Sequence, residues 1–74
     1  MNQQLQIMDL SKSGFAMLEQ LFWEGPTWDG NCVSKSGRRD IVDIGLAEHA
    51  FGYTWLTRDG VDTCVTFLGL NKFQ

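Results

Sequence analysis

Residues 34–60 read SKSGRRDIVDIGLAEHAFGYTWLTRDG, and this stretch determines the fold that we expect for the chain. Ser34 or Ser36 is suited to accept hydrogen bonds from the first exposed amides of a helix over residues 34–44. Gly45 fits the left-handed position that follows a helix end. The first half of the stretch therefore predicts a short helix with a defined stop.

The second half of the stretch predicts a hairpin and another helix. Residues 46–50 and 53–57 have the composition of two short strands joined through Phe51 and Gly52. Thr57 is suited to cap a last helix. That helix has an apolar stripe at helical spacing, formed by Val61, Cys64, Val65 and Leu68.

Upstream of this stretch, residues 13–23 have the periodicity of an amphipathic helix. Ser11 or Ser13 can cap it, and Gly25 with Pro26 ends it, because proline disfavours helical geometry in the residue before it. Its apolar stripe consists of Phe15, Leu18, Leu21 and Phe22.

The segment between the first two helices is short and rich in turn-forming residues. Residues 26–31 read PTWDGN and leave room for about one turn of helix. We expect Trp28 to fold back over the core as a lid. Residues 1–10 are either a flexible arm or the start of the first helix. The side chains that we place in the core from the two helical stripes include Phe15, Val61 and Leu68.

Composition indicates one small globular domain over residues 1–74. The 43% hydrophobic content suffices for a core, and no apolar run reaches the roughly 20 residues that span a bilayer. Without a secretion signal at the start, we expect a soluble, cytoplasmic protein. There Cys32 and Cys64 would stay reduced, and a single histidine, His49, argues against a zinc site.

Charge is unevenly distributed along a chain whose net charge is −3. Residues 34–41 contain Lys35, Arg38 and Arg39 against Asp40, whereas the remainder of the chain holds three basic residues against eight acidic ones. At about 100° per residue the three basic side chains share one face, with Val42 in its middle. A second face, formed by Gly37, Ile41 and Ile44, is suited to pack on the first helix.

The stretch SGRRDIVDIGLAEHAFGYTWLTRDG resembles the recognition helix, the wing and the following helix of winged-helix transcription regulators. It is also similar to the small winged-helix-like proteins of phage and prophage genomes. The resemblance covers about residues 34–68. It implies an α+β, winged helix-turn-helix-like domain that has three helices and a short two-stranded β-hairpin wing.

The same resemblance implies a non-enzymatic DNA-binding or regulatory protein that uses the helix over residues 34–44 and the hairpin over residues 46–57. The partner would be double-stranded DNA, bound by guanidinium and ammonium groups at phosphates or base edges, with a homodimer able to double the contacts. The alternative is a solvated helix face on which Asp43 pairs with Arg39. The candidate partner-binding residues are Lys35, Ser36, Arg38, Arg39, Val42, Phe51 and Tyr53.

A different class of function also fits the acidic remainder of the chain, which would repel a duplex unless it faces away. In that alternative the chain is a phage-encoded protein–protein interaction module in the host cytoplasm. It would inhibit or adapt a host complex, as anti-defence or anti-CRISPR proteins do. Exposed Phe51 at the hairpin tip would be a protein contact.

The remaining chemistry-bearing residues indicate neither an enzyme nor a cofactor site. Glu48 and His49 are neighbours on a strand and point to opposite faces, so they do not form a catalytic dyad. We expect no catalytic residue, no metal ligand and no cofactor.

Four aromatic residues provide a stacking platform for single-stranded nucleic acid or, as we favour, close the core: Trp23, Trp28, Tyr53 and Trp55.

Overall fold

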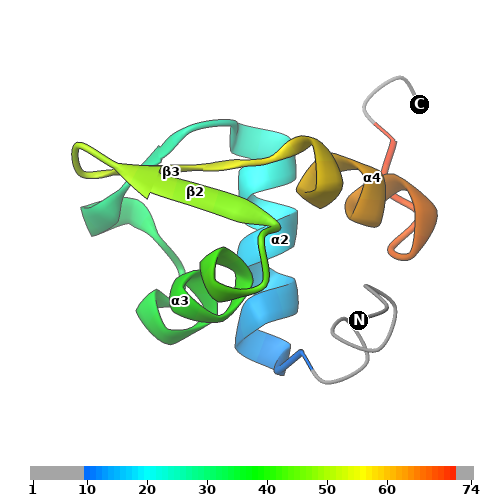
Figure 1. The fold of residues 1–74 in the computed structure, drawn as a ribbon, viewed down its shortest axis with the longest axis horizontal. Coiled ribbons are helices and arrows are strands. Elements are labelled where there is room, and N and C mark those ends of the chain that lie inside the picture. The colour runs from blue at the N-terminus through cyan, green and yellow to red at the C-terminus, as the bar shows by residue number, and fades with distance from the viewer. Residues whose placement is uncertain (1–9, 72–74) are drawn as a thin grey trace.

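The computed structural model describes residues 10–71 and contains three α-helices, one 3-10 turn and a three-stranded sheet within them (Figure 1). The expected α+β class is therefore confirmed. The arm predicted for residues 1–10 lies outside the described residues, apart from Leu10. The elements in chain order are α2 (Lys12–Glu24), β1 (Thr27–Trp28), η1 (Asp29–Asn31), α3 (Lys35–Asp43), β2 (Ala47–Ala50), β3 (Tyr53–Leu56) and α4 (Arg58–Thr66).

All three helices begin with the same cap, a hydroxyl residue followed by glycine three positions later. Ser11, Ser34 and Thr57 each accept a hydrogen bond from that glycine's amide, at 3.1, 3.0 and 3.1 Å. Side-chain caps of this kind satisfy backbone donors that a helix leaves unpaired. Where the sequence allows two caps for each of the first two helices, the structure uses the earlier serine. The three capped glycines, Gly14, Gly37 and Gly60, are all buried.

Glycines end the first two helices as expected. Gly25 has a φ of 78° and donates its amide to the carbonyl of Leu21 at 2.9 Å. Gly45 has a φ of 82° and donates to Val42, while the amide of Leu46 reaches back to Ile41 at 2.9 Å. These bonds satisfy the last carbonyls of α3 and turn the chain into β2.

The sheet has one strand more than the two-stranded wing expected from the sequence. Its order is β1-β3-β2, with both pairs antiparallel, so β3 is central. The hairpin turn places Phe51 at φ 55° and Gly52 at φ 79°, the left-handed values that a two-residue turn between twisted strands requires. The additional strand, β1, is only two residues long, and so it leaves no alternating pattern in the sequence.

The core lies between α2, α3, the inner face of the sheet and α4. Its buried apolar side chains are Met17, Leu18, Leu21, Phe22, Ile41, Leu46, Ala47 and Cys64. The prediction that Val61 belongs to it is wrong, because that side chain is 42% exposed, and Phe15 and Leu68 are only partly buried. α4 instead faces the core with Gly60, Thr63 and Cys64.

The larger aromatic residues also do not close the core in the way expected. Trp23, Trp28 and Tyr53 are about half exposed. Trp28 lies over Gly30, where any Cβ would overlap its ring, and near Gly52, instead of covering the core as a lid. Four residues of α2, Phe22 among them, supply half of the buried cluster, while the rings of Trp23, Trp28 and Tyr53 stay at the surface.

Helix α2 supports the other two helices, which lie on either side of it (Figure 1). The contact with α3 is close, since a Cβ at Gly37 would overlap the backbone carbonyl of Ser13. The hydroxyl of Ser11 also donates to Oδ2 of Asp40 at 3.0 Å. These contacts, together with buried Ile41, fix which face of α3 points outward.

Candidate functional site

The outward face of α3 carries two basic side chains. Gly37 and Ile41 are buried against α2, and Lys35 and Arg39 lie on the opposite, exposed side of the helix. Neither basic residue forms an ion pair with any residue in the range 10–71. Val42 beside them is half-buried and packs against the core. The predicted basic face therefore exists with Lys35 and Arg39 at its centre.

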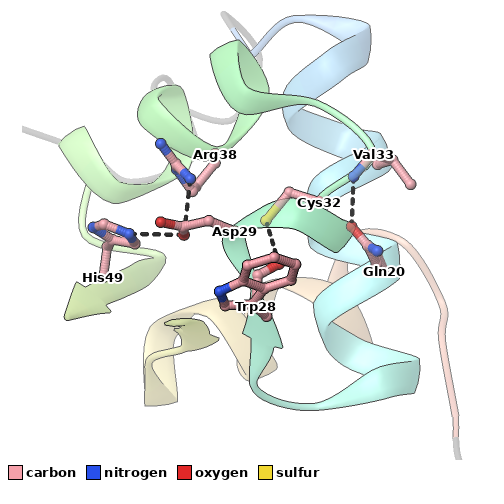
Figure 2. A network of polar contacts seen from close by, with 7 residues as sticks. All are labelled: Gln20, Trp28, Asp29, Cys32, Val33, Arg38 and His49. Carbon is pink, nitrogen blue, oxygen red and sulfur yellow. Dashed lines mark hydrogen bonds and ion pairs between the residues drawn. The ribbon is translucent and has the colours of Figure 1, made fainter. Parts of the chain in front are cut away.

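Arg38 is held by a carboxylate instead of projecting freely. Its Nη1 donates to Oδ1 of Asp29 at 3.0 Å, and its side chain is only 21% exposed (Figure 2). The same oxygen accepts a hydrogen bond from Nε2 of His49 at 2.9 Å. The expectation that Arg38 shares the outward role of its two basic neighbours is therefore only partly met.

Three elements meet at this carboxylate. Asp29 belongs to η1, Arg38 to α3 and His49 to β2, so one oxygen connects the turn, the helix and the hairpin (Figure 2). Each group is between about a fifth and a third exposed, and solvent therefore screens the pairing. The arrangement mainly sets the position of α3 relative to the hairpin, at a pair of residues close to its turn.

A second set of bonds fixes the segment that leads into α3. Gln20 on α2 donates from Nε2 to the carbonyl of Asn31 at 2.7 Å and accepts the amide of Val33 at Oε1, at 2.9 Å. The thiol of Cys32 points to the carbonyl of Trp28 at 3.7 Å (Figure 2). The amide group of Gln20 therefore replaces backbone partners that this irregular segment lacks.

The two hairpin residues predicted for the site lie apart from the basic face. Phe51 at the turn is 97% exposed. Tyr53 is 48% exposed and, by strand alternation, points to the sheet face opposite to that of buried Thr54. His49 lies opposite Thr54 in the register and faces α3. The structure thus brings the hairpin to α3 through His49 and leaves Tyr53 beside Trp28 on the outer face.

Acidic and hydroxyl groups surround the basic residues of α3. Ser36 is exposed and its hydroxyl lies 3.1 Å from that of Ser34. Asp43 is exposed, and no Arg39–Asp43 ion pair forms in the described part of the chain. The helix face that a partner would meet is therefore mixed, with two unpaired cations and one nearby carboxylate.

Sequence reasoning missed Asp29, His49 and Gln20 as residues that position the site. The sequence places Asp29 in the turn-rich segment of residues 26–31, and it raises His49 only as a zinc ligand or a member of a catalytic dyad. Asp29 is nine residues from Arg38 and twenty from His49, so no helical or strand period links them. The one signal for this contact in the sequence is the presence of an acidic residue and two basic residues that could pair with it, at distant positions.

The two thiols differ in environment. Cys64 is buried and its thiol lies 3.7 Å from the carbonyl of Leu18. Burial, with a smaller contribution from the charge of Glu19, raises the pKa of the Cys64 thiol from 9.0 to about 11. Cys32 is half-buried, and both cysteines are free. Over residues 10–71, no group of three histidine, cysteine or acidic side chains is placed to hold a metal ion.

Comparison with family models, curated proteins and solved structures finds no match to this chain. Among the helices of residues 10–71, none has the length and apolar character needed to cross a membrane.

Proposed function

We propose that this chain is a winged-helix DNA-binding protein, with α3 as the helix that meets double-stranded DNA and the β2–β3 hairpin as the wing. The observation that carries the proposal is the outward face of α3, where Lys35 and Arg39 are exposed and unpaired within the described residues. The major groove admits an α-helix, and arginine and lysine are the side chains that contact phosphates and guanine edges.

The order of elements supports the same proposal. A short helical turn, η1, precedes α3, and a hairpin follows it directly after Gly45. Asp29 joins all three of these elements through Arg38 and His49. A helix held between a turn and a hairpin in this way is preorganised, which lowers the cost of ordering on binding.

A salt titration of duplex binding tests the proposal. Two phosphate contacts, from Lys35 and Arg39, predict that log K falls against log salt concentration with a slope of about −1.8. Fluorescence anisotropy with a labelled duplex, starting near 50 mM salt, measures that slope. We expect Arg39→Glu to abolish binding, and Arg58→Glu, the same charge change on α4, to weaken it far less.

Equal loss of binding in the two charge-reversal variants would contradict the proposal, because only net charge would then matter. So would an absence of duplex binding by the unaltered chain at low salt. Asp29→Asn gives an opposite expectation, since it removes a carboxylate and releases Arg38. We expect it to tighten duplex binding and to make the slope steeper by about 0.9, the effect of one further phosphate contact.

A protein partner that binds at the hairpin turn is the second candidate. The observation that favours it is Phe51, which is 97% exposed at the hairpin turn, in a hairpin without lysine or arginine. Exposed aromatic residues at a protruding turn are typical anchors of protein interfaces. In this case Phe51→Ser would leave duplex binding unchanged and abolish binding to the protein partner, whereas Arg39→Glu would affect DNA binding first.

A further inference from the structure

The outer face of the sheet is aromatic and exposed. Trp28 on β1 lies directly opposite Tyr53 on β3, and the two side chains are 53% and 48% exposed. Trp55 follows two residues later on β3 and so shares this face. The aromatic surface formed by Trp28, Tyr53 and Trp55 runs along β3 toward the start of α4.

At that end the surface opens into an apolar groove between α2, β3 and α4. The groove has a volume of about 640 Å³, which falls within the range of ligand-binding sites in proteins. Leu21 and Phe22 of α2 line the groove, as do Gly25 and Pro26, which follow that helix. The remaining lining residues are Trp55, Leu56, Val61, Val65 and Asn71.

The way in which α4 divides its side chains between the core and the surface supports a binding role for the groove. Its core-facing residues are small or polar, namely Gly60, Thr63 and Cys64, whereas its two valines are turned away from the core. Val61 and Val65 are 42% and 51% exposed and lie one turn apart along the groove. A helix normally buries its largest apolar residues, so these valines indicate a second contact surface.

The charged residues near the groove indicate the charge of the partner that it would bind. Glu24 precedes Gly25 at the end of α2, Glu48 lies opposite Trp55 in the sheet register, and Asp62 follows Val61 on α4. Within residues 10–71, the elements α2, β2 and α4 carry five carboxylates in all and two basic residues, Arg58 and Lys12, of which Lys12 lies at the opposite end of α2 from Glu24. A nucleic acid, or the same face of a second copy of this chain, would bring like charge to the rim, whereas a basic partner would not.

We propose that this groove docks a basic amphipathic helix of a partner protein. The apolar side chains of such a helix, spaced one turn apart, would contact Val61, Val65 and Trp55, in the way that helical ligands bind apolar grooves. Its lysine or arginine residues would lie near Glu24 and Asp62. The inference does not rest on DNA binding, because α3 and α4 lie on either side of α2 (Figure 1).

Titration of the isotope-labelled chain with a synthetic peptide tests the docking site. The probe is a helical peptide with leucine at positions i, i+3, i+4 and i+7 and lysine elsewhere, and the comparison peptide has glutamate in place of lysine. We expect amide shift changes confined to α4, β3 and the end of α2. The lysine peptide should bind and the glutamate peptide should not.

Matched variants identify the residues that contribute to binding of the lysine peptide. Val61→Ala with Val65→Ala removes apolar contact without adding charge, and we expect it to weaken the lysine peptide at least about tenfold. Val33→Ala, the same change at an exposed valine outside the groove, should have no effect. Glu24→Gln should weaken binding about two- to fivefold, as expected for an exposed ion pair. Melting curves verify that each variant is folded.

Five outcomes would overturn the proposal. Equal binding of the glutamate peptide would remove the charge argument, and equal weakening by Val33→Ala would place the contact elsewhere. Amide shifts confined to α3, or no binding of either peptide, would leave the groove without this role. Dimerisation in size-exclusion chromatography that Val61→Ala with Val65→Ala abolishes would assign the groove to a second copy of the chain.

Discussion

The contact between α2 and α3 makes a sharp prediction for the variant Gly37→Ala. In an exposed helix, replacing glycine with alanine stabilises the fold by up to about 1 kcal/mol. At position 37 a Cβ would overlap the carbonyl carbon and oxygen of Ser13, which belong to the backbone and cannot rotate away. Overpacking of this kind costs about 1–3 kcal/mol, and a rigid neighbour places it toward the upper end.

The net effect expected for Gly37→Ala is therefore a loss of about 1–2 kcal/mol in the free energy of unfolding. For a domain of this size that loss corresponds to a fall in melting temperature of roughly 5–15 °C. Helices α2 and α3 would have to separate, so the outward face of α3 would move as well. We expect weaker duplex binding in addition to the lower melting temperature.

Gly14→Ala is the matched control, because Gly14 occupies the same position after its cap, Ser11. The three atoms nearest to a Cβ there all belong to the side chain of Leu10, which can change rotamer. We expect this variant to be as stable as the unaltered chain or slightly more stable. Circular dichroism at rising temperature and in urea measures both variants. If Gly37→Ala melts no lower than Gly14→Ala, the close α2–α3 contact described above is refuted.

Two further predictions concern buried groups. Thr54 is fully buried on the central strand, and its hydroxyl has no hydrogen-bond partner within residues 10–71. We expect Thr54→Val to raise the free energy of unfolding, measured in urea, by about 1 kcal/mol, because an unpaired buried hydroxyl is costly and valine keeps the shape. The control is Thr27→Val, which loses a hydrogen bond to the carbonyl of Gly25 at 2.9 Å and should not stabilise the fold. The pKa of the Cys64 thiol is raised from 9.0 to about 11, so the unfolded chain releases this proton first as the pH rises. Stability should therefore be fully present below pH 9.0 and fall by about 1 kcal/mol between pH 8 and pH 10 from this group alone, a fall that Cys64→Ala would lack.

Most of the fold could be predicted because its signals are local. A hydroxyl residue at 11, 34 or 57 with glycine three positions later marks each helix start, and glycines at 25 and 45 mark two helix ends. Phe51 and Gly52 likewise determine the hairpin register through their own backbone angles. Each of these features depends on a few neighbouring residues, and so each can be read from the chain alone.

The remaining features depend on contacts between distant segments. β1 has two residues and exists only because Thr27 and Trp28 find partners on β3. The exposure of Val61 and Val65 follows from the way α4 is placed on the core by Gly60, whose Cβ would overlap the carbonyl of Leu46. A stripe of apolar residues predicts a helix well, but it does not decide whether the core or a partner covers that stripe.

The candidate site likewise has one feature that depends on local sequence and another that depends on a distant segment. The helical period correctly predicts that Lys35 and Arg39 share a face, because that depends only on α3. The fate of Arg38 depends instead on Asp29, which a separate turn brings to 3.0 Å from its guanidinium. A basic residue on a predicted face is thus only a candidate contact until the nearest carboxylate in space is known.

Both proposed surfaces depend on backbone contacts more than on the side chains that form them. Gly37 places α3 against the carbonyl of Ser13, and Gly60 places α4 against the carbonyl of Leu46. Exposed residues such as Arg39 and Val65 contribute little to either contact, so their substitution should alter binding while the fold persists. The two surfaces can therefore be tested one at a time. If the two surfaces are independent, Arg39→Glu loses duplex binding and keeps peptide docking. The variant Val61→Ala with Val65→Ala then loses peptide docking and keeps duplex binding.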